Sequence, residues 1–121
     1  MTDSELDAWV WNAVFGVESV MIGNRAWKKD ENDPKGRAWV NAPTCPLFTT
    51  DLNAAARAEA KIARMGIPAR YWLSLRDVIL SALGLKELTV RAKLAMVTAT
   101  ARERCEAMYA MREQIERARA A

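Results

Sequence analysis

The spacing of apolar residues along the first part of the chain predicts a helix. Apolar side chains recur every three or four residues from residue 6 onward, at Leu6, Trp9, Val10, Ala13 and Val14. Such spacing places them on one helical face. Thr2 and Glu5 stand three residues apart, as in a capping box, and Gly16 is suited to end the helix. We therefore predict a helix over residues 3–15.

The same spacing predicts two further helices. One follows Thr49 or Thr50 as its N-cap, with Asp51 in the first turn, and is closed by Gly66. Its expected inner stripe is Leu52, Ala55, Ala56, Glu59, Ile62 and Ala63, while Arg57, Lys61 and Arg64 form a basic outer face. The other begins with a capping box at Thr100 and Glu103. Its expected inner stripe is Ala101, Cys105, Met108, Met111 and Ile115.

Extended segments are predicted between the helices. Residues 19–29 and 36–43 carry β-branched and aromatic side chains, and the stretch from Asp30 to Gly36, with Pro34, has strong turn chemistry. A hairpin is therefore expected, in which Trp27 and Trp39 stack as a cross-strand pair. Residues 69–75 are predicted to be a third strand, followed by a short helix that Ser74 caps and Gly84 ends. Residues 86–97 alternate apolar and polar side chains, which predicts a fourth strand.

The resulting order is helix, two strands, helix, strand, short helix, strand, helix. Helices have to cover a small sheet on which they bury their apolar faces. We predict one α+β domain over residues 1–121, with helices packed on a small, mainly antiparallel sheet as a layered α/β/α sandwich.

Composition places few limits on function. The chain has 121 residues, of which 51% are hydrophobic and 27% charged, as in ordinary globular domains. Neither a membrane-spanning apolar run nor a signal-peptide pattern is present in the sequence, so a cytoplasmic location is expected. Residues 1–50 carry a net charge of −2 and residues 51–121 one of +5. The basic half is suited to an anionic partner or serves only to keep the helices soluble.

Catalytic motifs are missing from the sequence. It contains no histidine, which removes the commonest general base and metal ligand. Cys45 and Cys105 are expected to be buried free thiols. The carboxylates of Asp30, Glu31 and Asp33 suit a hard cation, but such a turn is more commonly a solvated loop. We predict a non-enzymatic protein with no metal and no cofactor.

Tryptophan and arginine give the best candidates for a binding surface. The tripeptide Arg-Ala-Trp occurs twice, and the chain holds five tryptophans. Interleaved aromatic and basic residues suit core packing, a protein interface or a nucleic-acid platform. The acidic hairpin tip disfavours nucleic acid at that place. The candidate partner-binding residues are Arg25, Trp27, Arg37, Trp39, Arg70 and Trp72.

Three stretches carry a resemblance to a known family. They are "ELDAWVWNAVFGV" (residues 5–17), "PLFTTDLNAAARAEAKI" (46–62) and "VTATARERCEAMYAM" (97–111). In their order and spacing they resemble the phage ABA sandwich domain, a family of small phage and prophage proteins. The resemblance implies helix–sheet–helix layering and a phage or prophage origin. The family has no assigned reaction, so no site residue is implied.

These observations predict a phage or prophage interaction protein that binds a host protein. An inhibitor of a host defence system, for example an anti-CRISPR, is a concrete form of this prediction. The alternatives are a nucleic-acid-binding module that uses the basic half of the chain, and a protein that sequesters a small ligand or nucleotide. The oligomeric state stays open.

Overall fold

The structure is a computed structural model that describes residues 1–30, 32–37 and 44–120. Its first helix, α1, spans Asp3–Phe15, as predicted. Thr2 Oγ1 accepts the backbone N–H of Glu5, and Gly16 ends the helix in the left-handed region at φ 73°. Leu6, Val10 and Val14 are buried, so the predicted inner face is confirmed at these positions.

A short antiparallel hairpin follows, formed by β1 (Ser19–Ile22) and β2 (Arg25–Lys28). The two strands meet through the two-residue turn Gly23-Asn24, with Gly23 at φ 64°. The prediction treated residues 19–29 as a single strand and is wrong there, because the chain reverses within this segment. A glycine at the first position of a two-residue turn gives the tight reversal that a hairpin requires, and Gly-Asn is such a pair. Trp27 pairs with Val20.

The chain also reverses between Asp30 and Arg37. The Asp30 N–H donates to the Arg37 carbonyl at 2.8 Å, and the Gly36 N–H donates to the Asp33 carbonyl at 2.9 Å. The predicted turn is therefore present. Residues 38–43, with Trp39, lie outside the described residues, so the pairing of Trp27 with Trp39 stays a prediction.

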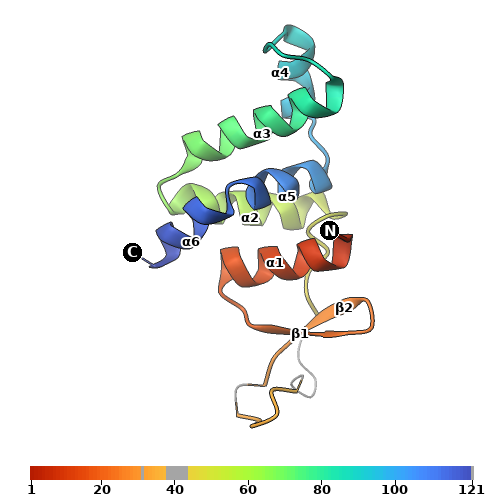
Figure 1. Ribbon diagram of the computed structural model, residues 1–121, viewed down its shortest axis with the longest axis vertical. Helices are drawn as coiled ribbons and strands as arrows, with labels where there is room; N and C mark the ends of the chain where they lie inside the picture. Colours follow the sequence, from red (N-terminus) through yellow and green to blue (C-terminus); the bar gives the residue numbers. More distant parts are fainter. Residues whose placement is uncertain (31, 38–43, 121) are drawn as a thin grey trace.

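Five more helices follow in the described part of the chain. They are α2 (Leu52–Arg64), α3 (Pro68–Leu83), α4 (Val90–Val97), α5 (Ala101–Ala110) and α6 (Arg112–Ala120). The hairpin lies against α1, and α1 packs on α2, α5 and α6 (Figure 1). Beyond these helices, α3 packs on α5 and α2, and α4 stands at the far end against α3 (Figure 1). The α+β class and the small antiparallel sheet are confirmed.

Both of the later predicted strands are helices. Residues 69–75 belong to α3, which begins with Pro68 in the first turn, where proline fits without losing a helical hydrogen bond. Ser74 lies inside this helix and donates to the Ala107 carbonyl at 2.6 Å, so it is not a cap. The predicted end at Gly84 is confirmed.

The strand predicted over residues 86–97 is replaced by α4. The Thr89 hydroxyl accepts the backbone N–H of Ala92 at 3.2 Å and so caps the helix. Most of residues 91–96 are strong helix formers, and no described strand lies beside them to pair with. Local propensity therefore outweighs the alternating pattern.

The helix α2 presents a different face from the expected one. Asp51, and neither Thr49 nor Thr50, is its N-cap, since Asp51 Oδ1 accepts the N–H groups of Asn53 and Ala54. Its buried residues are Ala54, Ala55, Ala58 and Ile62, whereas Leu52, Ala56 and Ala63 are exposed. Alanines occur all around this helix, so the apolar pattern does not single out one face.

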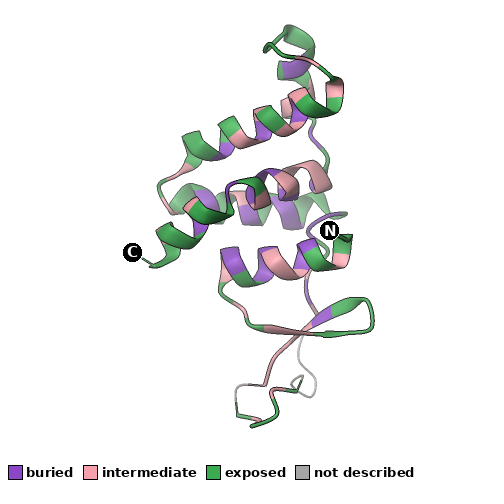
Figure 2. Ribbon diagram, viewed as in Figure 1, coloured by how far each residue is buried: buried purple, intermediate pink, exposed green. Residues whose placement is uncertain are grey.

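The core is one cluster that draws on all the larger helices. Its fully buried large side chains include Leu6, Phe48, Ile62, Leu75, Met108 and Ile115. Figure 2 shows buried positions where α1, α2, α3 and α5 meet, whereas most of α4 is exposed. The predicted inner stripe of the last helix is buried at every position, although Met111 divides that helix into α5 and α6.

A buried carboxylate joins α1 to the segment that enters α2. Asp7 accepts the Thr49 N–H at 2.8 Å, and both residues are buried. Burial raises the pKa of the Asp7 carboxyl above its ordinary value of 3.8, against the opposing effects of the Thr49 hydrogen bonds and of Arg25. The folded protein therefore binds this proton more tightly than the unfolded chain does.

Replacing Asp7 separates the hydrogen bond from the charge. Asp7→Ala leaves the Thr49 N–H without its acceptor and should cost about 1–3 kcal/mol of unfolding free energy. Asp7→Asn keeps an acceptor and cannot ionise. Because the pKa of Asp7 is raised in the folded protein, protonated Asp7 contributes fully to the free energy of unfolding below pH 3.8. This contribution is lost as the pH rises through the pKa of the folded state.

The measurement is urea unfolding of wild type, Asp7→Asn and Asp7→Ala from pH 3 to 7. Asp7→Asn should gain stability relative to wild type as the pH rises. A difference that stays constant with pH would contradict this assignment, because all other titrating groups are common to both proteins.

Candidate functional site

The hairpin candidates Arg25 and Trp27 are parts of the scaffold. The Arg25 guanidinium donates to Thr44 Oγ1 at 3.0 Å and to the Cys45 carbonyl at 3.2 Å. Trp27 is half-buried and forms an isolated bridge with Thr44. Both residues therefore fasten the segment that leads into α2 onto the hairpin.

Arg37 also has a partner within the chain. Its Nε donates to Asp33 Oδ2 at 2.7 Å, and the Lys35 N–H donates to the other carboxylate oxygen at 2.9 Å. These two hydrogen bonds hold the pKa of Asp33 below its usual value, and the bond from Lys35 has the larger effect. Asp30 Oδ1 likewise accepts the Asn32 N–H. The carboxylates of this turn thus stabilise the turn, while Glu31 and Trp39 lie outside the described residues.

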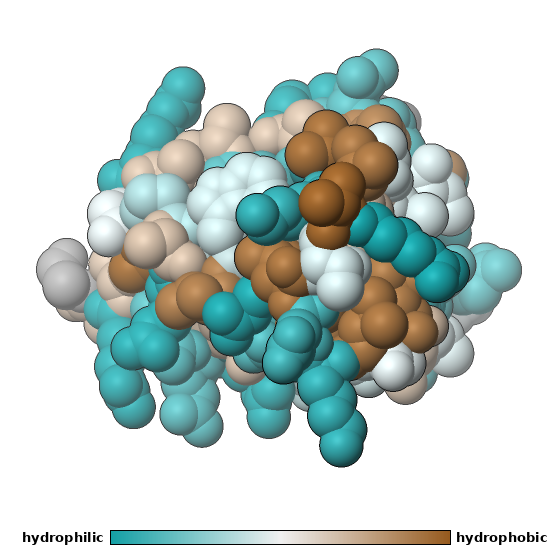
Figure 3. All heavy atoms as spheres, turned by 90° about the horizontal axis from the view of Figure 1, so that it is seen from above, coloured by the Kyte–Doolittle hydropathy of each residue, from teal (hydrophilic) through white to brown (hydrophobic). Residues whose placement is uncertain are grey.

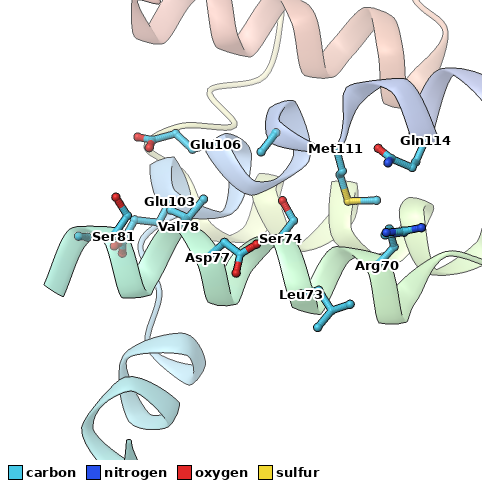
Figure 4. A pocket seen from close by; sticks show the side chains of 12 residues that line it. Arg70, Leu73, Ser74, Asp77, Val78, Ser81, Glu103, Glu106, Met111 and Gln114 are labelled. Atoms are coloured by element: carbon cyan, nitrogen blue, oxygen red, sulfur yellow. The ribbon is translucent and has the colours of Figure 1, made fainter. Parts of the chain in front are cut away.

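The remaining candidates, Arg70 and Trp72, lie on α3 but line different hollows. Arg70 lines a groove of about 640 Å³ between α3 and the α5–α6 pair (Figure 4). Trp72 lines a pocket of about 300 Å³ between α2 and α3, with its side chain 49% exposed. The five candidates that lie in the described residues are therefore not brought together at one site.

The groove beside Arg70 is polar. Figure 4 shows Asp77, Glu103 and Glu106 along it, on the facing sides of α3 and α5. Each carboxylate already has a partner. Asp77 pairs with Arg76, Glu106 pairs with Arg102, and Glu103 accepts the Thr100 N–H as the capping box predicts. The groove therefore leaves no carboxylate without a counterpart.

The pocket beside Trp72 contains a polar network that the sequence analysis missed. Arg104 Nη1 lies 2.8 Å and 2.9 Å from the two carboxylate oxygens of Glu59, and the Tyr71 hydroxyl donates to Glu59. The Arg104 and Glu59 side chains are 14% and 17% exposed. Burial, and next the hydrogen bond to Glu59, raise the pKa of Tyr71, so this phenol keeps its proton. Glu59 and Arg104 are 45 positions apart in the sequence, and Glu59 and Tyr71 are 12 apart. A local sequence pattern could therefore not predict these contacts.

Arg104 also fixes the end of α4. Its Nε donates to the Ala99 carbonyl at 3.0 Å, and its Nη2 donates to the Val97 carbonyl at 3.2 Å. One side chain on α5 thus joins the last residue of α4 to α2, and through Tyr71 to α3. This network fixes the orientation of α4 relative to α2, α3 and α5.

The helix held in this way carries an exposed apolar face. Val90, Leu94 and Val97 are 73%, 63% and 70% exposed, and we call these three residues the α4 ridge. Ala92 is buried, and Ala95 and Met96 are half-buried against the core. Figure 3, which looks down on the end of the molecule where α4 lies, shows apolar residues gathered there among hydrophilic ones. Because residues 86–97 were predicted to be a strand, this face was not predicted.

The two cysteines are free and buried, as predicted. Desolvation raises the pKa of both thiols to about 12. The Cys45 thiol donates to the Asp7 carbonyl at 3.3 Å. Both thiols are therefore protonated near neutral pH and are poor nucleophiles.

Among the described residues, no group of three or more His, Cys, Asp or Glu side chains is placed to hold a metal ion. No helix in the described ranges has the length and apolar character to cross a bilayer. The basic face predicted for α2 is exposed at Arg57, Lys61 and Arg64.

Comparison with models of known families, with curated proteins and with solved structures finds no match.

Removing one member of the Glu59–Arg104 pair should strongly destabilise the protein. Glu59→Ala leaves the half-buried guanidinium without its carboxylate and should cost about 1–3 kcal/mol of unfolding free energy. Glu59→Gln keeps an oxygen acceptor and should cost less. The matched control is Glu113→Ala, which removes an exposed ion pair with Arg117 and should change the free energy by less than about 1 kcal/mol.

The free energies come from urea unfolding followed by tryptophan fluorescence. Equal costs for Glu59→Ala and Glu113→Ala would contradict the role given to the Glu59–Arg104 pair.

Proposed function

We propose that this protein acts by binding another protein, and that the α4 ridge is the surface it uses. The observation that carries this proposal is the exposure of three large aliphatic side chains on one helical face. Val90, Leu94 and Val97 are spaced four and three residues apart, so they form one continuous stripe. Isolated apolar side chains are common on protein surfaces, but a contiguous group on one element is typical of an interaction site.

The orientation of α4 supports this proposal. A surface helix ordinarily turns its largest apolar residues toward the core. In α4 the fully buried position is Ala92, while the larger Val90 and Leu94 point away from the body. Exposing aliphatic surface costs roughly 25 cal/mol for each Å² that burial would remove from water. A partner that covers the ridge recovers this free energy.

The proposed surface differs from the six residues predicted to bind a partner. Arg25 and Arg37 are engaged within the chain, and Trp27 is half-buried. Trp72, with the neighbouring Leu73, is the part of the earlier prediction that stays exposed on α3. The ridge is favoured over Trp72 because its side chains are more exposed and are contiguous on one helix.

The resemblance to small phage proteins gives the proposal a biological setting. We propose a phage or prophage interaction protein that performs no chemistry and binds a host protein in the cytoplasm. Inhibition of a host defence system, such as a CRISPR effector, is the concrete form that can be tested. The combined support is the resemblance, the lack of catalytic motifs in the sequence and the exposed ridge.

The ridge should be required for this activity. Val90→Gln, Leu94→Gln and Val97→Gln together replace three exposed side chains by a good helix former, so the fold should be retained. In bacteria with an active defence system, wild-type protein should raise the efficiency of phage plaquing, and the triple variant should lose at least about tenfold of that gain.

The matched control replaces the exposed Met21 and Ile22 of the hairpin with glutamine. It should keep the wild-type effect, and circular dichroism should show that both variants are folded. Equal activity of wild type and the ridge variant would overturn the assignment of the surface. No rescue by wild type against a panel of defence systems would overturn the inhibitory role.

A further inference from the structure

The charges beside the α4 ridge indicate the chemistry of its partner. With 100° of rotation for each residue, Val97, Val90 and Leu94 lie within a sector of about 60°. Arg91 falls on one side of this sector and Lys93 on the other. Both residues are exposed, and neither forms an ion pair with another residue in the described part of the chain.

The local charge is predominantly positive. Residues 85–98 contain Lys86, Arg91 and Lys93, and their one acidic residue is Glu87. A ridge with cations along both edges favours a partner surface that carries carboxylates at the matching positions.

A second copy of this chain is a poor occupant for the same reason. In parallel helix packing the opposite edges of the two ridges meet, which places Arg91 near Lys93 of the other copy. In antiparallel packing like edges meet, which places each cation near its own equivalent. Either arrangement brings cations of the two copies together, with no acidic side chains opposite them on the ridge. Like charges at a helix interface oppose association.

The width of the ridge favours a helix as the partner. Interfacial helices that lie in a membrane bury a wide apolar face, whereas a helix–helix seam is narrow. The ridge is narrow, and its residues have the i, i+4, i+7 spacing of anchors in helix-to-helix recognition. Resting on the proposed protein-binding role, we infer that the partner presents an amphipathic helix whose apolar seam is flanked by Asp or Glu on both sides.

Two synthetic helical peptides test this inference. Both have about three heptads with leucine and isoleucine at the seam, and the flanking positions are all glutamate in one and all lysine in the other. The peptides carry fluorescein, and binding is measured as fluorescence anisotropy at low and high salt. At low salt the glutamate peptide should bind at least about tenfold more tightly than the lysine peptide, and added salt should reduce this difference.

Charge reversal on the protein gives the matched comparison. Arg91→Glu with Lys93→Glu should invert the preference between the two peptides. Arg57→Glu with Lys61→Glu changes the net charge equally but lies on the exposed face of α2, so it should leave the preference in place. The glutamine variant of the ridge should lose binding of both peptides.

The outcomes separate this inference from the proposed function. Equal binding of the two peptides, or no binding of either, would overturn the acidic partner, while loss of plaquing rescue in the ridge variant would still support protein binding. Ridge-dependent dimerisation in sedimentation experiments would overturn it in favour of a second copy. Ridge-dependent binding to phosphatidylglycerol vesicles, without peptide binding, would overturn it in favour of a membrane surface.

Discussion

The half-buried ion pair between Glu59 and Arg104 is the interaction on which the arrangement of the helices depends. It joins α2 to α5, Tyr71 adds α3 through Glu59, and the remaining donors of Arg104 bind the Val97 and Ala99 carbonyls at the end of α4. A charge that is largely removed from water needs its partners in place. The network therefore specifies one arrangement of four helices, which apolar packing of a core rich in alanine would define less sharply.

This constraint explains why α4 shows Val90, Leu94 and Val97 to solvent, while Met96 packs against the core. The helix has two turns and meets the body mainly through α3, with Ala92 as its buried residue. Turning it over would bury Val90 and Leu94, but it would also move the carbonyls that Arg104 binds. The fold accordingly keeps an apolar ridge exposed at its far end. In the proposed function this ridge is the contact with a partner, and the cations at its edges select which partner fits.

The sequence predicted those elements whose signals are local. The helix that ends at Gly16 and the capping box of Thr100 and Glu103 were found because caps and periodicity lie within a few residues of each other. The alternation over residues 86–97 was misleading, because a strand needs a partner strand and this segment has none in the described fold. Its helix is capped by Thr89 and packs on α3. The site was missed for two physical reasons. The Glu59–Arg104 pair is a contact between distant residues, and the ridge exists only if α4 is a helix.

The most direct test of this account is the solvent exposure of individual methyl groups in dilute solution. Methyl-labelled protein would be titrated with a soluble paramagnetic agent, and relaxation enhancement would be measured for Val90, Leu94 and Val97. Ile62 and Ile79, which are buried, serve as internal references. The account predicts strong enhancement at the ridge and little at the references. Ridge methyls as protected as those of Ile79 would contradict the claim that α4 offers a free apolar surface.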